Sequence, residues 1–105
     1  METYVAYDFG DRLRVVLGDE SARNLLIDMG FYSGEDSSVW FVDIGDEKDK
    51  SAVFERLRDA GVCFSAGREW SPSEVFEYLR DKGFIKGGYR KISWNAPGRY
   101  LVEDA

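Results

Sequence analysis

Three segments of the chain share one pattern, Leu-x-Asp-x-Gly followed by an apolar residue. They occupy residues 26–31, 57–62 and 79–84. Glycine readily adopts the left-handed conformation that ends many helices, and in the Schellman motif an apolar residue just beyond it contacts the third residue from the helix end. The spacing of the leucine, the glycine and the last apolar residue fits that motif. We therefore predict three helices, each ending just before its glycine.

The start of the third helix is predicted from residues 71–74, Ser-Pro-Ser-Glu. A serine cap, a proline in the first turn and a glutamate three residues after the serine are typical of a helix beginning. We expect Ser71 and Glu74 to form a reciprocal capping box. Trp70 and Val75 are spaced as a hydrophobic staple, which predicts a structural role for the tryptophan.

A hairpin is predicted at the N-terminus, with strands over residues 4–9 and 12–17 around a Gly-Asp turn. Leucine and valine at positions 13, 15 and 17 alternate with Arg12 and Arg14, which is typical of a half-buried strand. A short helix over residues 11–17 is the alternative. The apolar runs at 38–44 and 62–65 predict two further strands.

A second hairpin is predicted over residues 89–94 and 99–103, around the turn sequence Asn-Ala-Pro-Gly. Proline directly before glycine favours a type II turn. Strand alternation predicts one side of this hairpin to face the core, namely Ile92, Trp94, Tyr100 and Val102. It predicts the other side to point outward, namely Tyr89, Lys91 and Arg99.

The order of elements is two strands, helix, strand, helix, strand, helix and two strands. This order predicts an α+β (or α/β) fold, a two-layer sandwich in which three helices pack on a mixed sheet with N- and C-terminal hairpins. The chain has 105 residues, 44% of them hydrophobic. That length suits one core, so we expect a single globular domain over residues 1–105.

The residues that are missing exclude several chemistries. The chain has no histidine and only one cysteine, Cys63. Histidine-dependent nucleophiles and histidine-containing zinc sites are therefore excluded, and we expect no catalytic residues, no cofactor and no metal site. Cys63 lies in an apolar run, which predicts a buried and inert thiol. The absence of a long apolar segment and of a signal sequence predicts no membrane association and a cytoplasmic location.

Charge is unevenly distributed along the sequence. Residues 1–81 carry 18 acidic and nine basic side chains, whereas residues 82–102 carry five basic and no acidic ones. Segregated charge indicates surfaces that face partners. The acidic candidate surface consists of Glu35, Asp36, Asp43, Asp46, Glu47 and Asp49. A divalent cation at these acids is the alternative, but the calcium-loop pattern is absent and acids are common at helix starts.

The second candidate surface is the basic C-terminal hairpin, which consists of Lys86, Tyr89, Arg90, Lys91 and Arg99. Cations interleaved with aromatic residues are typical of single-stranded nucleic-acid binding. The net charge of −6 opposes that function, because it repels a polyanion.

We expect a small, acidic, non-enzymatic protein-binding module. The composition fits an inhibitor, of the phage anti-defence or toxin-immunity type, that covers a basic site on a target protein. The alternative is a nucleic-acid-associated factor that uses the basic hairpin.

Overall fold

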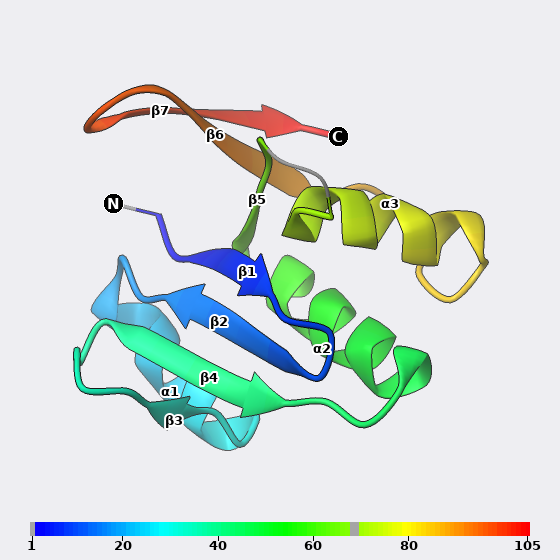
Figure 1. Cartoon of the computed structure of the whole chain (residues 1–105), viewed down its shortest axis with the longest axis horizontal. Coiled ribbons are helices and arrows are strands. Elements are labelled where there is room, and N and C mark those ends of the chain that lie inside the picture. The colour runs from blue at the N-terminus through cyan, green and yellow to red at the C-terminus, as the bar shows by residue number, and fades with distance from the viewer. Residues whose placement is uncertain (1, 68–69) are drawn as a thin grey trace.

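The computed structural model describes residues 2–67 and 70–105, and it confirms an α+β fold with three α-helices and a mixed seven-stranded sheet. Figure 1 shows the arrangement, with α1 and α2 behind the sheet in this view. The elements in chain order are β1 (Tyr4–Asp8), β2 (Arg12–Val16), the 3-10 turn η1 (Glu20–Ala22), α1 (Arg23–Asp28), β3 (Tyr32–Ser33), β4 (Val39–Asp43), α2 (Glu47–Asp59), β5 (Cys63–Ser65), α3 (Pro72–Asp81), β6 (Arg90–Ala96) and β7 (Arg99–Asp104).

The two hairpins occupy different places in the sheet, whose strand order is β3-β4-β2-β1-β5-β6-β7. The N-terminal hairpin, β1 and β2, lies in the interior between β4 and β5. The C-terminal hairpin, β6 and β7, forms one end of the sheet. β1, β5 and β6 are parallel, and the remaining pairs are antiparallel. β2 pairs with both β1 and β4, so the alternative of a helix over residues 11–17 is excluded.

All three predicted helix ends are confirmed. The glycines are left-handed, with φ of +86° at Gly30, +86° at Gly61 and +82° at Gly83. The backbone N–H just after each glycine donates to the carbonyl of the leucine in the pattern, at 2.9, 3.0 and 3.0 Å. This is the six-to-one hydrogen bond of the Schellman motif. The local sequence alone therefore specifies where each helix stops.

The predicted start of α3 is right in position but wrong in detail. Ser71 makes no side-chain capping bond; its hydroxyl instead lies 3.1 Å from that of Ser73. The carboxylate of Glu74 accepts the N–H of Trp70, at 2.9 Å, instead of that of Ser71. Trp70 has a left-handed backbone, φ +57°, and its side chain is 64% exposed. The left-handed turn carries the indole away from the helix start, so the predicted staple does not bury it.

The core lies between the sheet and the helices and is centred on stacked aromatic rings. The ring centroids of Phe64 lie 5.0 Å from Phe54 of α2 and 5.1 Å from Phe76 of α3. Tyr89 stacks on Phe76 at 4.4 Å. Burying each of these side chains stabilises the fold by about 1.5–3 kcal/mol. These contacts fix α2 and α3 on one face of the sheet.

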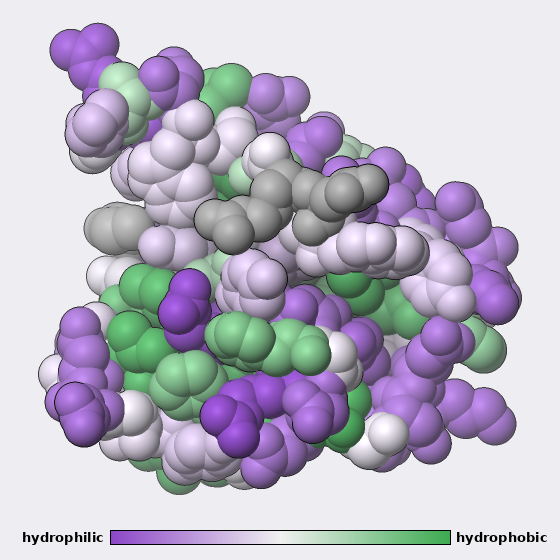
Figure 2. All heavy atoms as spheres, in the orientation of Figure 1, coloured by the Kyte–Doolittle hydropathy of each residue, from purple (hydrophilic) through white to green (hydrophobic). Residues whose placement is uncertain are grey.

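The opposite face of the sheet is not covered by the core helices. Inward residues of β1, β2 and β4, such as Val5, Leu13 and Val42, belong to the core, whereas Arg12 and Arg14 lie on the other side. On the face seen in Figure 2, hydrophobic residues gather over β2 and β4 among hydrophilic ones. Within residues 2–67 and 70–105, none of the helices is both long enough and apolar enough to span a bilayer.

Three rings of the C-terminal hairpin lie on the sides opposite to those predicted, whereas Ile92 is fully buried and Arg99 is exposed, as predicted. Tyr89, expected to point outward, is only 4% exposed, whereas Trp94 and Tyr100, expected in the core, are 40% and 41% exposed. The parallel register pairs Lys91 with Phe64, so the odd-numbered residues of β6 share the face covered by helices. Alternation predicted correctly which residues share a side, but on that side only Ile92 is fully buried, whereas Trp94 and Tyr100 are exposed.

Two local features of this part of the sheet were predicted correctly. Gly98 has φ +75° after Pro97, as the third position of a type II turn requires, and the turn joins β6 to β7. Cys63 on β5 is fully buried, and this burial raises the pKa of its thiol. A thiol that is both buried and protonated is a poor nucleophile.

Candidate functional site

The six predicted acidic residues do not form one surface. Glu35 and Asp36 precede β4, and the other four follow it. The strand between them has five residues and is therefore about 16 Å long. The acidic surface predicted from the sequence is thus divided between the two ends of one strand.

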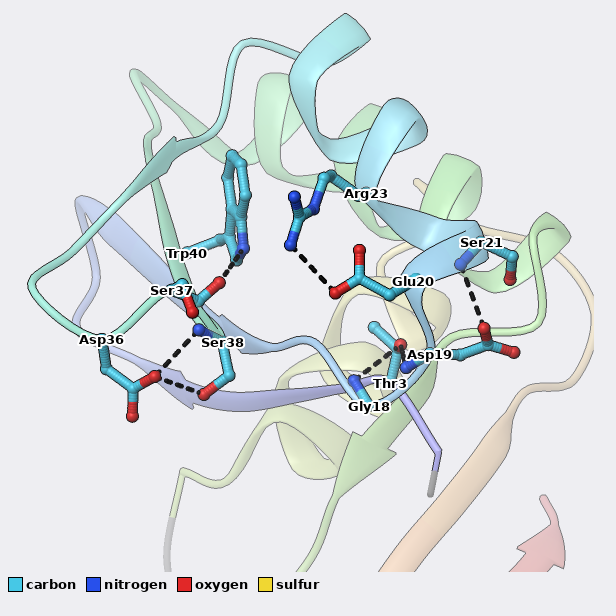
Figure 3. A network of polar contacts seen from close by, with 10 residues as sticks. All are labelled: Thr3, Gly18, Asp19, Glu20, Ser21, Arg23, Asp36, Ser37, Ser38 and Trp40. Atoms are coloured by element: carbon cyan, nitrogen blue, oxygen red, sulfur yellow. Dashed lines mark hydrogen bonds and ion pairs between the residues drawn. The ribbon is translucent and has the colours of Figure 1, made fainter.

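At the first end, Asp36 has a structural role that Figure 3 shows. Its carboxylate accepts the backbone N–H of Ser38 at 2.9 Å and the Ser38 hydroxyl at 2.7 Å. These bonds lower the pKa of Asp36, because they favour the charged carboxylate. Nearby, the Trp40 indole donates to the Ser37 carbonyl at 3.1 Å. The β3–β4 turn is therefore held by its own side chains.

At the other end, four acids surround the start of α2; we call them the acidic ridge, Asp43, Asp46, Glu47 and Asp49. Asp46 caps the helix by accepting the N–H of Asp49 at 2.8 Å. Asp43 pairs with Arg12 at 3.3 Å, and Glu47 accepts the hydroxyl of Tyr78 at 3.1 Å. Negative charge here is favoured by the positive end of the helix dipole. Among the residues that the structure describes, no acid cluster is arranged to hold a metal ion.

Folding brings acidic residues beside two cations of the predicted basic hairpin, Arg90 and Lys91. Arg90 pairs with Glu2 at 3.5 Å. The β6–β7 register also places Asp104 opposite Arg90 and Glu103 opposite Lys91. The acid-free segment of the sequence therefore folds back onto the two acids that follow it. Lys86 and Arg99 remain exposed.

Tyr89 is removed from this surface altogether. It is buried in the core, and its hydroxyl donates to Glu77 at 2.8 Å and lies 3.3 Å from the Ser73 carbonyl. Burial, first, and then the contact with the Glu77 carboxylate raise the pKa of the Tyr89 phenol. Its role is to pack and to anchor α3, not to contact a partner.

A different surface, which the sequence did not identify, lies on the uncovered side of the sheet. We call it the aromatic face, and its members are Tyr4, Tyr7, Phe9, Arg12, Arg14, Trp94 and Tyr100. Tyr4 meets Trp94 edge-on with centroids 4.9 Å apart, and Tyr7 lies 4.5 Å from Phe9. The guanidinium of Arg14 lies 5.9 Å from the ring centroids of both Tyr7 and Phe9. The face thus combines large rings with arginine.

A hollow of about 430 Å³ opens in this face where β1 and β5 end. Its lining includes Tyr4, Tyr7, Trp94, Ser65 and Arg14, which is the charged member of the described lining. Burial raises the pKa of the Tyr4 phenol, and the positive charge of Arg14 acts in the opposite direction. The hollow could accept an apolar or aromatic group with an acceptor directed at Arg14.

A second hollow, of about 310 Å³, lies between the β1–β2 turn, α2 and α3; we call it the Trp70 groove. Phe9 lines it and also contacts Tyr7, so the groove continues from the aromatic face. On the opposite wall, Trp70 meets Tyr78 edge-on with centroids 6.1 Å apart. Lys50 also lines the groove.

An ion pair between Asp8 and Lys50 supports the Trp70 groove. The carboxylate and ammonium groups are 3.0 Å apart, and their side chains are only 3% and 13% exposed. Asp8 also accepts the N–H of Gly10 at 2.7 Å. The pair joins the end of β1 to α2 and fixes the turn that carries Phe9.

One sequence signal could have located part of the aromatic face. In the predicted N-terminal hairpin, the arginines at 12 and 14 mark the solvent side of β2. The observed register places Tyr7 opposite Arg14, after a bulge in β1 that the sequence did not reveal. The contribution of Trp94 could not have been inferred, because it depends on β6 lying beyond β5.

Comparison of the chain with protein-family models, with curated proteins and with solved structures gave no significant match.

Proposed function

We propose that the protein is a non-enzymatic module that binds another protein on its aromatic face and Trp70 groove. Tryptophan, tyrosine and arginine are the residues most often responsible for affinity at protein interfaces. Trp94, Tyr100 and Arg14 provide these types on a face that no helix of the core covers. Charged residues are depleted at interface centres, and the named members of the aromatic face include two charged side chains, Arg12 and Arg14.

The conformation of Trp70 carries the proposal. A non-glycine residue with positive φ costs about 1–3 kcal/mol, and such strain often occurs at functional positions. Burial of the side chain does not compensate this cost, because the indole is 64% exposed beside an open groove. An exposed tryptophan next to an apolar hollow is suited to anchor a partner that fills the hollow and covers the ring.

Charge indicates the kind of partner. The chain has a net charge of −6, and the acidic ridge adjoins the Trp70 groove through Glu47. Complementary charge favours partners with basic residues around an apolar site. More specifically, we propose an inhibitor that covers a basic site on its target, of the phage anti-defence or toxin-immunity type.

Nucleic acid is the second candidate, because stacked rings with arginines on an open sheet can bind single strands. The charges on the face weaken this alternative. Arg12 is paired with Asp43, and Arg90 with Glu2. A backbone-tracking groove needs several free cations, and one of the two arginines on the aromatic face, Arg12, is already paired.

Affinity capture from the native lysate tests the proposed function. We expect Trp70→Ala, Trp94→Ala and Arg14→Ala each to reduce recovery of a stoichiometric protein at least about tenfold, as truncation of an interface anchor does. Ile27→Ala is the matched control, because Ile27 is an exposed apolar residue of α1, outside this face. Equal recovery with all four variants would contradict the proposal.

A fluorescently labelled single-stranded oligonucleotide tests the alternative. We expect no change in anisotropy with the wild-type protein at about 50 mM salt. Binding that weakens steeply with salt and is lost in Arg14→Ala would instead support the nucleic-acid function.

A further inference from the structure

The outer edge of β7 is a long, open hydrogen-bonding edge. β7 is the last strand of the sheet and has six residues, whereas β3 at the other end has two. Natural edge strands are often very short, or carry charged side chains, above all lysine, or proline or a bulge that prevents further pairing. β7 contains neither lysine nor proline, the bulge of its ladder lies in β6 between Trp94 and Ala96, and Tyr100 and Leu101 at its centre are 41% and 49% exposed. Such an edge is suited to pair with another strand.

The β6–β7 ladder determines which backbone groups face this edge. Tyr89 and Ala105 exchange both backbone hydrogen bonds, at 3.2 and 2.8 Å. Hydrogen-bonded pairs recur at every second residue of an antiparallel ladder, so the odd-numbered residues of β7 direct their backbone groups to β6. The even-numbered residues Tyr100 and Val102 direct their N–H and C=O groups to the open edge.

We propose that two copies of this chain pair antiparallel through β7, with the two-fold axis at Leu101. In this register Tyr100 and Val102 of one copy exchange backbone hydrogen bonds with Val102 and Tyr100 of the second copy. The two Leu101 side chains then face each other. The sheets of the two copies become one continuous sheet.

The charges of β7 fit this register. Arg99 lies at one end of the strand and Glu103 at the other, and both are exposed. Antiparallel pairing about Leu101 places each Arg99 opposite Glu103 of the second copy, whereas parallel pairing would place like charges together. Opposite charges directly across a ladder stabilise it, and like charges destabilise it. The strand is therefore complementary to itself in hydrogen bonds, apolar contacts and charge.

A neighbouring register that the ladder also permits is less favourable. Centred on Val102, it would place Leu101 opposite Glu103 and Tyr100 opposite Asp104. Two apolar side chains would then face carboxylates, and Arg99 would face the last residue, Ala105. The register at Leu101 avoids all of these mismatches. The dimer goes beyond the proposed function, because it uses the strand edge and requires no other protein.

A charge swap tests the dimer and its register. We expect sedimentation velocity between about 1 and 500 µM to show a concentration-dependent dimer of the wild-type chain. Arg99→Glu and Glu103→Arg should each raise the dissociation constant of the dimer about tenfold, because each variant creates two like-charge pairs. The double variant should return to within about threefold of the wild type. Arg56→Glu on α2 is the matched control and should leave the constant unchanged.

A cross-link tests the position of the axis. Directly opposed residues that are not hydrogen-bonded lie with Cα atoms about 4.5 Å apart, which is within disulfide range. Leu101→Cys should therefore give a covalent dimer under mild oxidation, and Ile27→Cys should not. A wild-type chain that is monomeric throughout this range would overturn the dimer. A dimer whose single variants are not weakened, or are not rescued by the double variant, would overturn the register.

Discussion

The two hairpins have similar alternating sequences, yet they lie in different surroundings. In the N-terminal hairpin, Leu13 and Val15 are buried and Arg14 lies on the open side, as alternation predicts. In the C-terminal hairpin, alternation fails for the rings, because Trp94 is exposed and Tyr89 is buried, although Ile92 is buried as predicted. Alternation therefore identifies the residues that share a face. The neighbouring strands and helices decide which face is covered.

Position in the sheet explains the difference. The N-terminal hairpin has a strand on each side and helices across one face, so only one placement of its leucines is possible. The C-terminal hairpin is held on one side by β5. Only its beginning reaches the helices, where Tyr89 stacks on Phe76. Its rings are thereby left on the open face.

Truncation of one leucine in each hairpin should give the largest difference between the two hairpins in the free energy of unfolding. Leu13→Ala should lower the free energy of unfolding by about 2–5 kcal/mol, because it leaves a cavity in the core. Leu101→Ala should lower it by less than about 1 kcal/mol, because Leu101 is half exposed. Urea unfolding at a low, monomeric concentration measures both. Equal losses would show that β7 is covered in the isolated chain.

Removal of one ion-pair partner should give the next largest contrast. Lys50→Met leaves the buried carboxylate of Asp8 uncompensated and should cost about 3 kcal/mol. Arg90→Met breaks the more exposed pair with Glu2 and should cost less than about 1 kcal/mol. Thermal unfolding of the two variants compares them. A Lys50→Met protein as stable as Arg90→Met would show that water reaches the Asp8 carboxylate, in contradiction to its burial.

Alkaline pH should produce a smaller effect. The pKa values of Cys63, Tyr4 and Tyr89 are raised by burial above their ordinary values of 9.0 for the thiol and 10.0 for the phenols. The folded protein thus holds these protons more tightly than the unfolded chain, and stability should fall as the pH rises above about 9.

Two phenylalanine variants assign this pH dependence. Tyr89→Phe should reduce the loss of stability between about pH 8 and pH 10.5 more than Tyr4→Phe does, because the pKa of Tyr89 is raised further. Urea midpoints at the two pH values provide the measurement. A larger effect of Tyr4→Phe than of Tyr89→Phe would contradict this prediction and show that the pKa of Tyr4 is raised further.

The helices, their ends and most strands could be predicted because their signals are local. The pattern Leu-x-Asp-x-Gly-apolar contains the residues that a Schellman stop needs, and all three stops were found. β3 was missed because a strand of two residues has no alternating pattern, and it is defined only by its pairing with β4. The left-handed Trp70 was missed because Glu74 bonds to the residue before the expected one.

The candidate surfaces were harder to predict, because charges that are neighbours in the sequence are not always neighbours on the folded surface. The hairpin brings Glu103 and Asp104 back opposite Lys91 and Arg90, so the segment that lacks acids in the sequence has acids beside it in the fold. β4 separates the acids that its flanking loops carry. The aromatic face combines side chains from β1, β2 and β6, whose adjacency requires the complete strand order.

Solvent accessibility of the three tryptophan side chains tests most directly whether one side of the sheet is uncovered. Trp40 is buried in the core, whereas Trp70 and Trp94 lie on the proposed binding surface. With a soluble paramagnetic agent and dilute protein, we expect strong broadening of the indole N–H signals of Trp70 and Trp94 and little of Trp40. If Trp94 and Trp70 were as protected as Trp40, the sheet would be covered on both sides, and the proposed binding surface would not exist.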